Sequence, residues 1–206
     1  MTIVNSDKIL TILTPTYNRA STLAKLFSSL EAQSNRQFEW LIIDDGSRDC
    51  TRELVDQFKE RATFNIRYIY KENGGKHTAI NTGIDEIPTK LTFIVDSDDY
   101  LKSNAVELII ETEKKYQGNN NISSFWFLQE NILGKIIGDE FNGEEFVDNY
   151  TNIMVNSGIR GDKKSVYYTL IRKNNPFPVF PGEKFIGEST IHQKISRNYK
   201  SVFINE

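Results

Sequence analysis

Short apolar runs alternate with amphipathic segments along the first 117 residues of the chain. Four of the runs are rich in β-branched and aromatic residues, as buried strands are; they are Lys8–Thr14, Phe38–Ile43, Ile66–Tyr70 and Leu91–Val95. The segments that follow them place apolar residues three and four apart, as on one face of a helix; they are Leu23–Leu30, Thr51–Arg61, His77–Gly83 and Asn104–Tyr116. This repeated strand-helix order predicts a mostly parallel central sheet with helices on both faces.

Two residues near the first strand predict where the first elements begin and end. Pro15 has no N–H to donate to a neighbouring strand, so we expect the first strand to stop there. Ser21 is expected to be the N-cap of the first helix, because its hydroxyl can accept a hydrogen bond from an unpaired backbone N–H.

The pattern changes after residue 117. The polar run Gly118–Asn121 predicts a loop, and we expect it to separate a first half, 1–117, from a second half, 118–206, of one domain. In the second half we expect two antiparallel strands, a helix, a strand, a helix and a last strand; they are Ile122–Leu128, Leu133–Gly138, Gly143–Asn149, Ser165–Arg172, Ser189–Asn198 and Ser201–Ile204. The prolines at 176, 178 and 181 predict an extended loop before the last helix. The expected fold is α/β, with a smaller antiparallel or irregular second half that could be truncated at its C-terminus.

Composition narrows the class of protein. The 206 residues carry a net charge of −3, which argues against bulk nucleic-acid binding. A single cysteine, Cys50, excludes an internal disulfide and fits a reducing compartment. The chain has neither a run of about 18 apolar residues, as a membrane span requires, nor a signal peptide. We expect Met1–Asp7 to be a frayed leader before the first strand. We expect a cytoplasmic protein, with peripheral contact at the inner face of a membrane left open.

Carboxylates gather directly after the fourth expected strand. Asp96, Asp98 and Asp99 follow the apolar run that ends at Val95. Such close acids repel one another unless a cation lies between them, and Mg²⁺ or Mn²⁺ binds few carboxylates together with phosphate oxygens. Asp96 and Asp98 share one face of an extended chain, whereas Asp99 points elsewhere. The simpler alternative is an acidic turn that leads into a helix.

The other strand ends also carry distinctive side chains. Thr14, Pro15, Tyr17 and Asn18 follow the first strand, Asp45 follows the second, and Gly75 and Lys76 follow the third. The carboxyl ends of parallel strands lie at one edge of a sheet, which is where open α/β sheets bind ligands. We therefore expect a pocket for a base, a ribose and a metal-bound diphosphate, although each residue alone could belong to an ordinary turn.

Four segments in this order resemble the family 2 glycosyltransferases, which have the GT-A fold; they are Leu13-Thr14-Pro15-Thr16-Tyr17-Asn18-Arg19, Ile42-Ile43-Asp44-Asp45-Gly46-Ser47, the stretch Asn73–Gly83 and Val95-Asp96-Ser97-Asp98-Asp99. The resemblance implies an inverting, metal-dependent transfer of a sugar from a nucleotide-diphosphate sugar, usually a UDP- or dTDP-sugar. It also implies that Asp45 contacts the base and Asp96 the ribose. Asp98 would bind Mn²⁺ or Mg²⁺, and Asp99 could replace or assist it. The acceptor would be a saccharide or a lipid-linked molecule in cell-surface polysaccharide biosynthesis.

In this family an acid at the start of a helix in the second half acts as the general base. Glu188 occupies that position, but Ser189 follows it where a second acid is commoner. Alternatively, Glu188 is a first-turn glutamate favoured by the helix dipole, with Glu183 and Asp162 as other candidates for the base. His77 is expected to be structural. His192 could bind metal or acceptor, but an ordinary surface histidine is the simpler interpretation.

Other readings of the chain stay open at this point. The basic residues of 160–173 could meet a pyrophosphate, although a solvated surface is the favoured interpretation; they are Arg160, Lys163, Lys164, Arg172 and Lys173. The protein could also be a non-catalytic nucleotide-binding or assembly subunit of the same fold. A sugar-phosphate nucleotidyltransferase is disfavoured, because Thr14-Pro15-Thr16-Tyr17 stands where such enzymes carry a glycine-rich basic loop.

Overall fold

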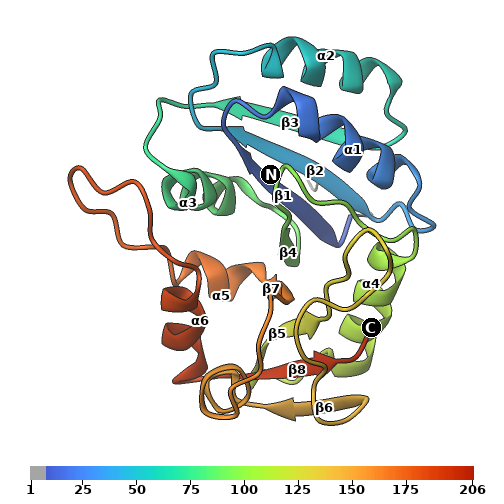
Figure 1. Ribbon diagram of the computed structural model, residues 1–206, viewed down its shortest axis with the longest axis vertical. Coiled ribbons are helices and arrows are strands. Elements are labelled where there is room, and N and C mark those ends of the chain that lie inside the picture. Colours follow the sequence, from blue (N-terminus) through green and yellow to red (C-terminus); the bar gives the residue numbers. More distant parts are fainter. Residues whose placement is uncertain (1–7) are drawn as a thin grey trace, which may run out of the picture.

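The computed structural model describes residues 8–206, so the expected leader at 1–7 lies outside the described residues. Within that range one eight-stranded sheet runs through the molecule in the order β3-β2-β1-β4-β7-β5-β8-β6 (Figure 1). The first half supplies β1 (Leu10–Thr16), α1 (Ala20–Glu31), β2 (Phe38–Asp44), α2 (Thr51–Arg61), β3 (Asn65–Tyr70), α3 (Lys76–Glu86), β4 (Leu91–Ile94) and α4 (Ala105–Tyr116). All pairings among its four strands are parallel, as predicted.

Two expected boundaries of the first elements are wrong. Pro15 lies inside β1, opposite Ile43 of β2. The ladder between β1 and β4 already ends at Leu13, so the missing N–H of Pro15 faces a side where no strand requires it. Ser21 lies inside α1, which begins after Arg19 without a side-chain cap. The first backbone N–H of that helix, from Ala20, instead donates to Asp49, 3.2 Å away, because the loop after β2 lies beside the helix start.

The second half continues the same sheet. It consists of β5 (Ile122–Phe127), β6 (Glu145–Asp148), η1 (Thr151–Asn156), β7 (Lys164–Tyr168), α5 (Thr169–Lys173), α6 (Ser189–Ser196) and β8 (Lys200–Ile204). The strand β7 pairs antiparallel with both β4 and β5, and so connects the halves. β8 is parallel to β5 and β6 is antiparallel to β8, which makes this half of the sheet mixed.

Three expected elements of the second half differ from the structure. Residues 133–138 form no continuous strand: Asn131 Oδ1 accepts from the N–H groups of Leu133 and Lys135 in a turn, and a single antiparallel bridge joins Glu130 to Ile136. The predicted helix Gly143–Asn149 is instead the edge strand β6, where Phe146 stacks on the β8 residue Phe203 with ring centroids 5.5 Å apart. The predicted strand Ser165–Arg172 ends at Tyr168, where the chain turns into α5. For β6, pairing with the distant strand β8 outweighs the local helical pattern.

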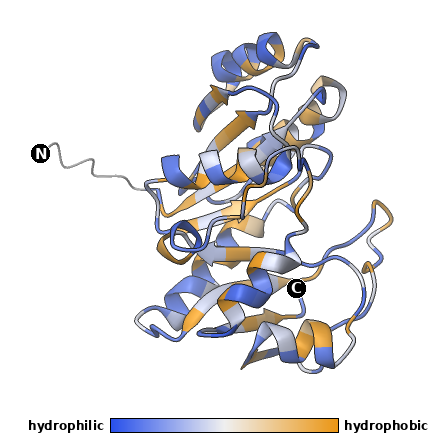
Figure 2. Cartoon of the chain, turned by 90° about the vertical axis from the view of Figure 1, so that its left-hand side faces the viewer, coloured by the Kyte–Doolittle hydropathy of each residue, from blue (hydrophilic) through white to orange (hydrophobic). Residues whose placement is uncertain are grey.

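The two faces of the sheet carry separate hydrophobic clusters. Alternate residues of β1 point to opposite faces, so Leu10 and Ile12 join one cluster and Leu13 joins the other. Helices α1, α2 and α4 cover the first face, whereas α3 and α6 cover the second. Figure 2 shows the hydrophobic colouring running along the strands, while the helices alternate between hydrophobic and hydrophilic residues. Both clusters include strands from both halves of the chain, so the sheet packs as one body.

Candidate functional site

A cleft lies at the carboxyl edge of the parallel strands and has a volume of about 470 Å³. Its lining comes from the ends of β1, β2 and β4, from the turn before α3, and from the loop before α6; the residues are Pro15, Thr16, Tyr17, Arg19, Asp45, Asn73, Gly75, Lys76, Asp96, Ser97, Asp98 and Lys184. The structure therefore brings together seven of the residues that the sequence singled out: Pro15, Tyr17, Asp45, Gly75, Lys76, Asp96 and Asp98.

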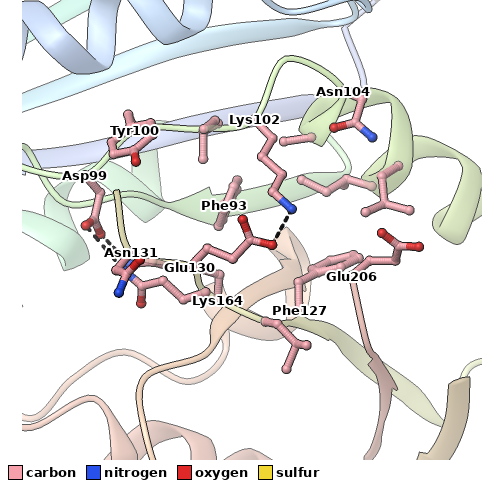
Figure 3. Close-up of a pocket in the computed structure, with 16 residues that line it drawn as sticks. Phe93, Asp99, Tyr100, Lys102, Asn104, Phe127, Glu130, Asn131, Lys164 and Glu206 are labelled. Atoms are coloured by element: carbon pink, nitrogen blue, oxygen red, sulfur yellow. Dashed lines mark hydrogen bonds and ion pairs between the residues drawn. The ribbon is translucent and has the colours of Figure 1, made fainter. Parts of the chain in front are cut away.

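Four predicted site residues lie outside this lining, and one of them, Glu188, reaches the cleft only through its ion pair with Lys76. Thr14 is buried, and its hydroxyl accepts a hydrogen bond from the Trp40 indole at 2.9 Å. Asn18 connects the loops after β1 and β2, because its N–H donates to Ser47 and its side-chain oxygen accepts from Arg48. Asp99 pairs with Lys164 at 2.5 Å and lines a separate, largely apolar cavity beside α4 (Figure 3). Asp99 thus points away from Asp98.

Asp45 is buried and surrounded by donors from the glycine-rich turn. One carboxylate oxygen accepts from Lys71 Nζ at 2.6 Å and from the Gly74 N–H at 3.0 Å. The other accepts from the Gly75 N–H at 2.7 Å and from the Asn73 amide at 3.1 Å. Charge-assisted hydrogen bonds of this kind are roughly twice as strong as neutral ones. Asp45 therefore fixes the conformation of the turn 73–75 at the edge of the cleft.

Lys76 connects the cleft to the start of α6. Its Nζ lies 2.6 Å from Asp96 and 2.9 Å from Glu188. Burial opposes the charge of Lys76, but the Glu188 and Asp96 carboxylates outweigh that effect and raise its pKa above the usual value. The amine is therefore charged at neutral pH. It connects Asp96, the residue expected to bind the ribose, to Glu188, the expected general base.

Glu188 is the residue that precedes the first turn of α6. The loop that leads to it is tied to the cleft, because Lys184 Nζ donates to Asn73 at 2.8 Å. Of the two reserve candidates for the base, Glu183 accepts from the N–H of Phe185 within the loop. Like Glu188, neither Glu183 nor Asp162 lines the cleft, but Glu188 pairs with the lining residue Lys76. Sequence reasoning missed Lys71 and Lys184 as site residues, since only tertiary contacts place Lys184 beside the turn 73–75.

The acids beside Tyr17 suit a cation that is shared with a substrate. Asp98 is half-exposed and has a long ion pair, 3.6 Å, with Arg19. Among residues 8–206 no group of three His, Cys, Asp or Glu side chains could hold a metal by itself. Mg²⁺ and Mn²⁺ bind readily to one or two carboxylates when substrate phosphates complete the coordination. The side chains present therefore fit a metal that binds together with a diphosphate.

Behind Glu188, on the same helix, His192 is enclosed by aromatic rings and is not an ordinary surface histidine. Its ring is parallel to that of Tyr167, and Nδ1 lies 2.7 Å from the Tyr167 hydroxyl. Burial and the nearby Arg172 lower the pKa of His192 to about 3. Arg172 itself is buried over the rings of Tyr167 and Phe177, so the solvated interpretation of this basic residue is wrong.

Comparison with known proteins identifies related chains. A family model described as "Glycosyl transferase family 2" matches residues 11–161. The glycosyltransferase GlyG of Streptococcus pneumoniae is 28% identical over 97% of this chain and 69% of its own length. The structure of S. aureus TarS 1-349 in complex with UDP-GlcNAc covers 96% of this chain and 56% of its own, with a TM-score of 0.76 and 19% identity. The mannosyltransferase PcManGT from Pyrobaculum calidifontis, in complex with GDP-Man and Mn²⁺, covers 96% of this chain with a TM-score of 0.66 and 18% identity.

The lengths in these comparisons differ. This chain spans 69% of GlyG and 54% of the PcManGT chain. At 18–19% identity the two structural likenesses establish a shared fold. Within residues 8–206 no helix combines the length and the apolar character that crossing a bilayer requires.

Proposed function

Because the chain belongs to glycosyl transferase family 2, we propose that it transfers a sugar from a nucleotide-diphosphate sugar, of the UDP type, to an acceptor hydroxyl with inversion. One observation carries the proposal: Lys76 contacts both Asp96, inside the cleft, and Glu188, at the start of α6. A donor held in the cleft would therefore meet an acid that belongs to the second half of the chain.

The donor half of the site follows from side-chain chemistry. Tyr17 offers an aromatic face to a base, with the turn held by Asp45 beside it. Asp96 accepts hydrogen bonds from the ribose hydroxyls, and the cations Arg19, Lys76 and Lys184 surround the space for a diphosphate. Asp98 would hold Mn²⁺ or Mg²⁺ together with the phosphates, and the bound ion would offset the charge that builds on the departing diphosphate.

Glu188 performs the proton transfer in this proposal. The acceptor oxygen attacks the anomeric carbon while its proton passes to the Glu188 carboxylate, and the bond to the nucleoside diphosphate breaks on the opposite side. Such an attack from one face inverts the anomeric configuration. The acceptor is a saccharide or a lipid-linked molecule, and the reaction takes place on the cytoplasmic side of a membrane.

Donor binding is tested by thermal unfolding with UDP and Mn²⁺. At a ligand concentration about 100 times Kd, we expect a rise in Tm of about 5–10 °C that a chelator reduces. Asp98→Asn should lose the metal-dependent part of this rise. Asp99→Asn is the matched control, because Asp99 turns toward Lys164, and it should keep the rise. The absence of a shift with any nucleoside diphosphate would refute the donor site, and an equal loss in Asp99→Asn would move the metal to that residue.

The base is tested by Glu188→Gln, which keeps the shape of the side chain and removes its proton acceptor. We expect transfer to fall by about 10²–10⁴-fold while the nucleotide-induced shift in Tm remains. Glu183→Gln is the control, since that carboxylate caps its own loop, and it should retain transfer. If Glu188→Gln turned over donor and acceptor at the original rate, the base would be another group.

A further inference from the structure

The loop between α5 and α6, residues 174–188, projects from the molecule at the left of Figure 1. Both of its ends are anchored. Near its start, Phe177 is buried, and its backbone N–H and C=O both hydrogen-bond to the Asn81 side chain. Near its end, Lys184 bonds to Asn73 and Glu188 bonds to Lys76. The loop is therefore an outward extension of the candidate active site, fixed at its base.

The tip of this loop exposes apolar side chains in a defined turn. The carbonyl of Phe180 accepts from the Glu183 N–H at 3.2 Å, with Pro181 and Gly182 between them and a φ of +81° at Gly182, as in a type II turn. Val179, Phe180 and Phe185 are 61%, 57% and 72% exposed. Pro178 and Pro181 each fix one φ angle of this loop. Clustered apolar exposure of this kind marks a surface for interaction.

A hollow with a basic rim lies beside the base of the loop. It is lined by Pro176, Phe177 and Pro178 together with the outer face of α6, which carries Lys194, and with Arg197 directly after the helix. None of the residues that line this hollow is Asp or Glu. The tip carries one acid, Glu183, whose exposed carboxylate accepts from the N–H of Phe185. An apolar projection thus stands beside cations, which is the pairing that anionic lipid surfaces attract.

We propose that residues 174–188 and the outer face of α6 dock onto an anionic lipid bilayer. Val179, Phe180 and Phe185 enter the interfacial layer, and Lys194 and Arg197 face the lipid phosphates. This proposal rests on the proposed function, since a lipid-linked acceptor would approach Glu188 along the same loop. A bilayer accounts for both the apolar tip and the basic hollow, whereas a sugar stacked on Phe185 would leave Val179 and the basic hollow without a role.

The test is co-sedimentation of the full chain with phosphatidylcholine vesicles, with and without phosphatidylglycerol. The wild-type protein should bind, more tightly when phosphatidylglycerol is present. The variant V179S/F180S should lose about tenfold or more in apparent affinity, because two apolar side chains no longer leave water. K194Q/R197Q should lose the preference for phosphatidylglycerol.

The matched control is I132S/L133S, which removes two apolar residues that are even more exposed, at 79% and 87%, in the turn after β5. It should bind vesicles as the wild type does. The proposal is overturned if the wild type binds no vesicles, or if I132S/L133S loses as much affinity as V179S/F180S. It is also overturned if light scattering shows a dimer that V179S/F180S dissociates, because a second copy would then cover the tip.

The UDP and Mn²⁺ thermal shift, measured on the same variants, separates the two proposals. V179S/F180S and K194Q/R197Q should keep that shift, which also shows that they are folded. If the wild-type protein shows the UDP-induced rise in Tm but does not bind vesicles, the proposed docking surface alone is refuted. A protein that binds vesicles and no nucleotide would overturn the proposed function instead.

Discussion

Single side chains around the cleft are held by partners that come from distant parts of the sequence. Asp45 receives four hydrogen bonds from Lys71, Asn73, Gly74 and Gly75. A buried carboxylate with this many donors stabilises the turn, and loss of the carboxylate would leave all four donors without this partner. Lys76 joins two carboxylates in a similar way. The residues of the proposed donor site therefore also support its local structure.

His192 makes the stability of the protein depend on pH. Its pKa is about 3 in the folded state and near 6.5 in an unfolded chain, so below pH 6.5 the unfolded state binds the extra proton. The free energy of unfolding should therefore fall with pH between 6.5 and 3, by about 1.4 kcal/mol per pH unit from this residue. In His192→Gln this contribution is absent, and urea titrations at pH 7.5 and 5 should show a smaller difference than in the wild type. Equal differences would contradict a neutral His192 among the aromatic rings.

The turn between β3 and α3 shows how whole elements meet at the cleft. Asn73, Gly74 and Gly75 hydrogen-bond to the carboxylate of Asp45, directly after β2, and Asn73 also accepts from the loop before α6. Gly75 has a φ of +95°, and a Cβ atom there would lie 2.1 Å from the carbonyl oxygen of Lys184. The loop before α6 can therefore approach the turn 73–75 this closely only because residue 75 is a glycine.

A comparison of Gly75→Ala with Gly118→Ala distinguishes the cost of a positive φ from the cost of a steric clash. Both glycines have positive φ, but a Cβ atom on Gly118 would meet nothing within 4 Å. We expect Gly118→Ala to lower the free energy of unfolding by about 1–2 kcal/mol, and Gly75→Ala by about 1–3 kcal/mol more, because Lys184 must move. Gly75→Ala should also weaken the UDP-induced shift in Tm, which Gly118→Ala leaves intact. Equal losses of stability in urea titrations would show that the loop does not pack on the turn.

At the scale of the whole molecule, one sheet and two shared cores join the halves that we expected on either side of residue 117. The strand β7 pairs with β4 of the first half and β5 of the second. At this seam the hydroxyl groups of Thr92 and Thr169 are 2.8 Å apart. Neither half completes a hydrophobic cluster alone, since strands of both contribute to each.

This continuity predicts a single cooperative unfolding transition. The chain offers a probe in each half, because Trp40 lies in β2 and Trp126 in β5. The variants Trp40→Phe and Trp126→Phe each leave one tryptophan to report on its surroundings. In each variant, the urea midpoint from fluorescence should agree with the midpoint from circular dichroism. A fluorescence midpoint that differs from the circular dichroism midpoint would mean that the halves unfold separately.

The order of strands and helices in the first half was determined by the sequence itself. The runs at 38–43 and 91–95 and the helical spacing at 51–61 are local patterns, so the parallel sheet and the edge where its loops gather could be predicted. The same edge brings Asp45, Asp96 and Asp98 together, because strand direction and chain order decide it.

Other features were decided only by tertiary structure. The edge strand β6 depends on its pairing with β8, a partner far along the chain, so its local pattern was misleading. The same is true of Asp99, which turns to Lys164, and of Lys184, which reaches the turn 73–75 across more than 100 residues. Periodicity records which face of an element is apolar, but a contact between side chains depends on where two distant segments meet. For this reason the sequence predicted the edge of the sheet that forms the site, and the fold decided which side chains share the cleft.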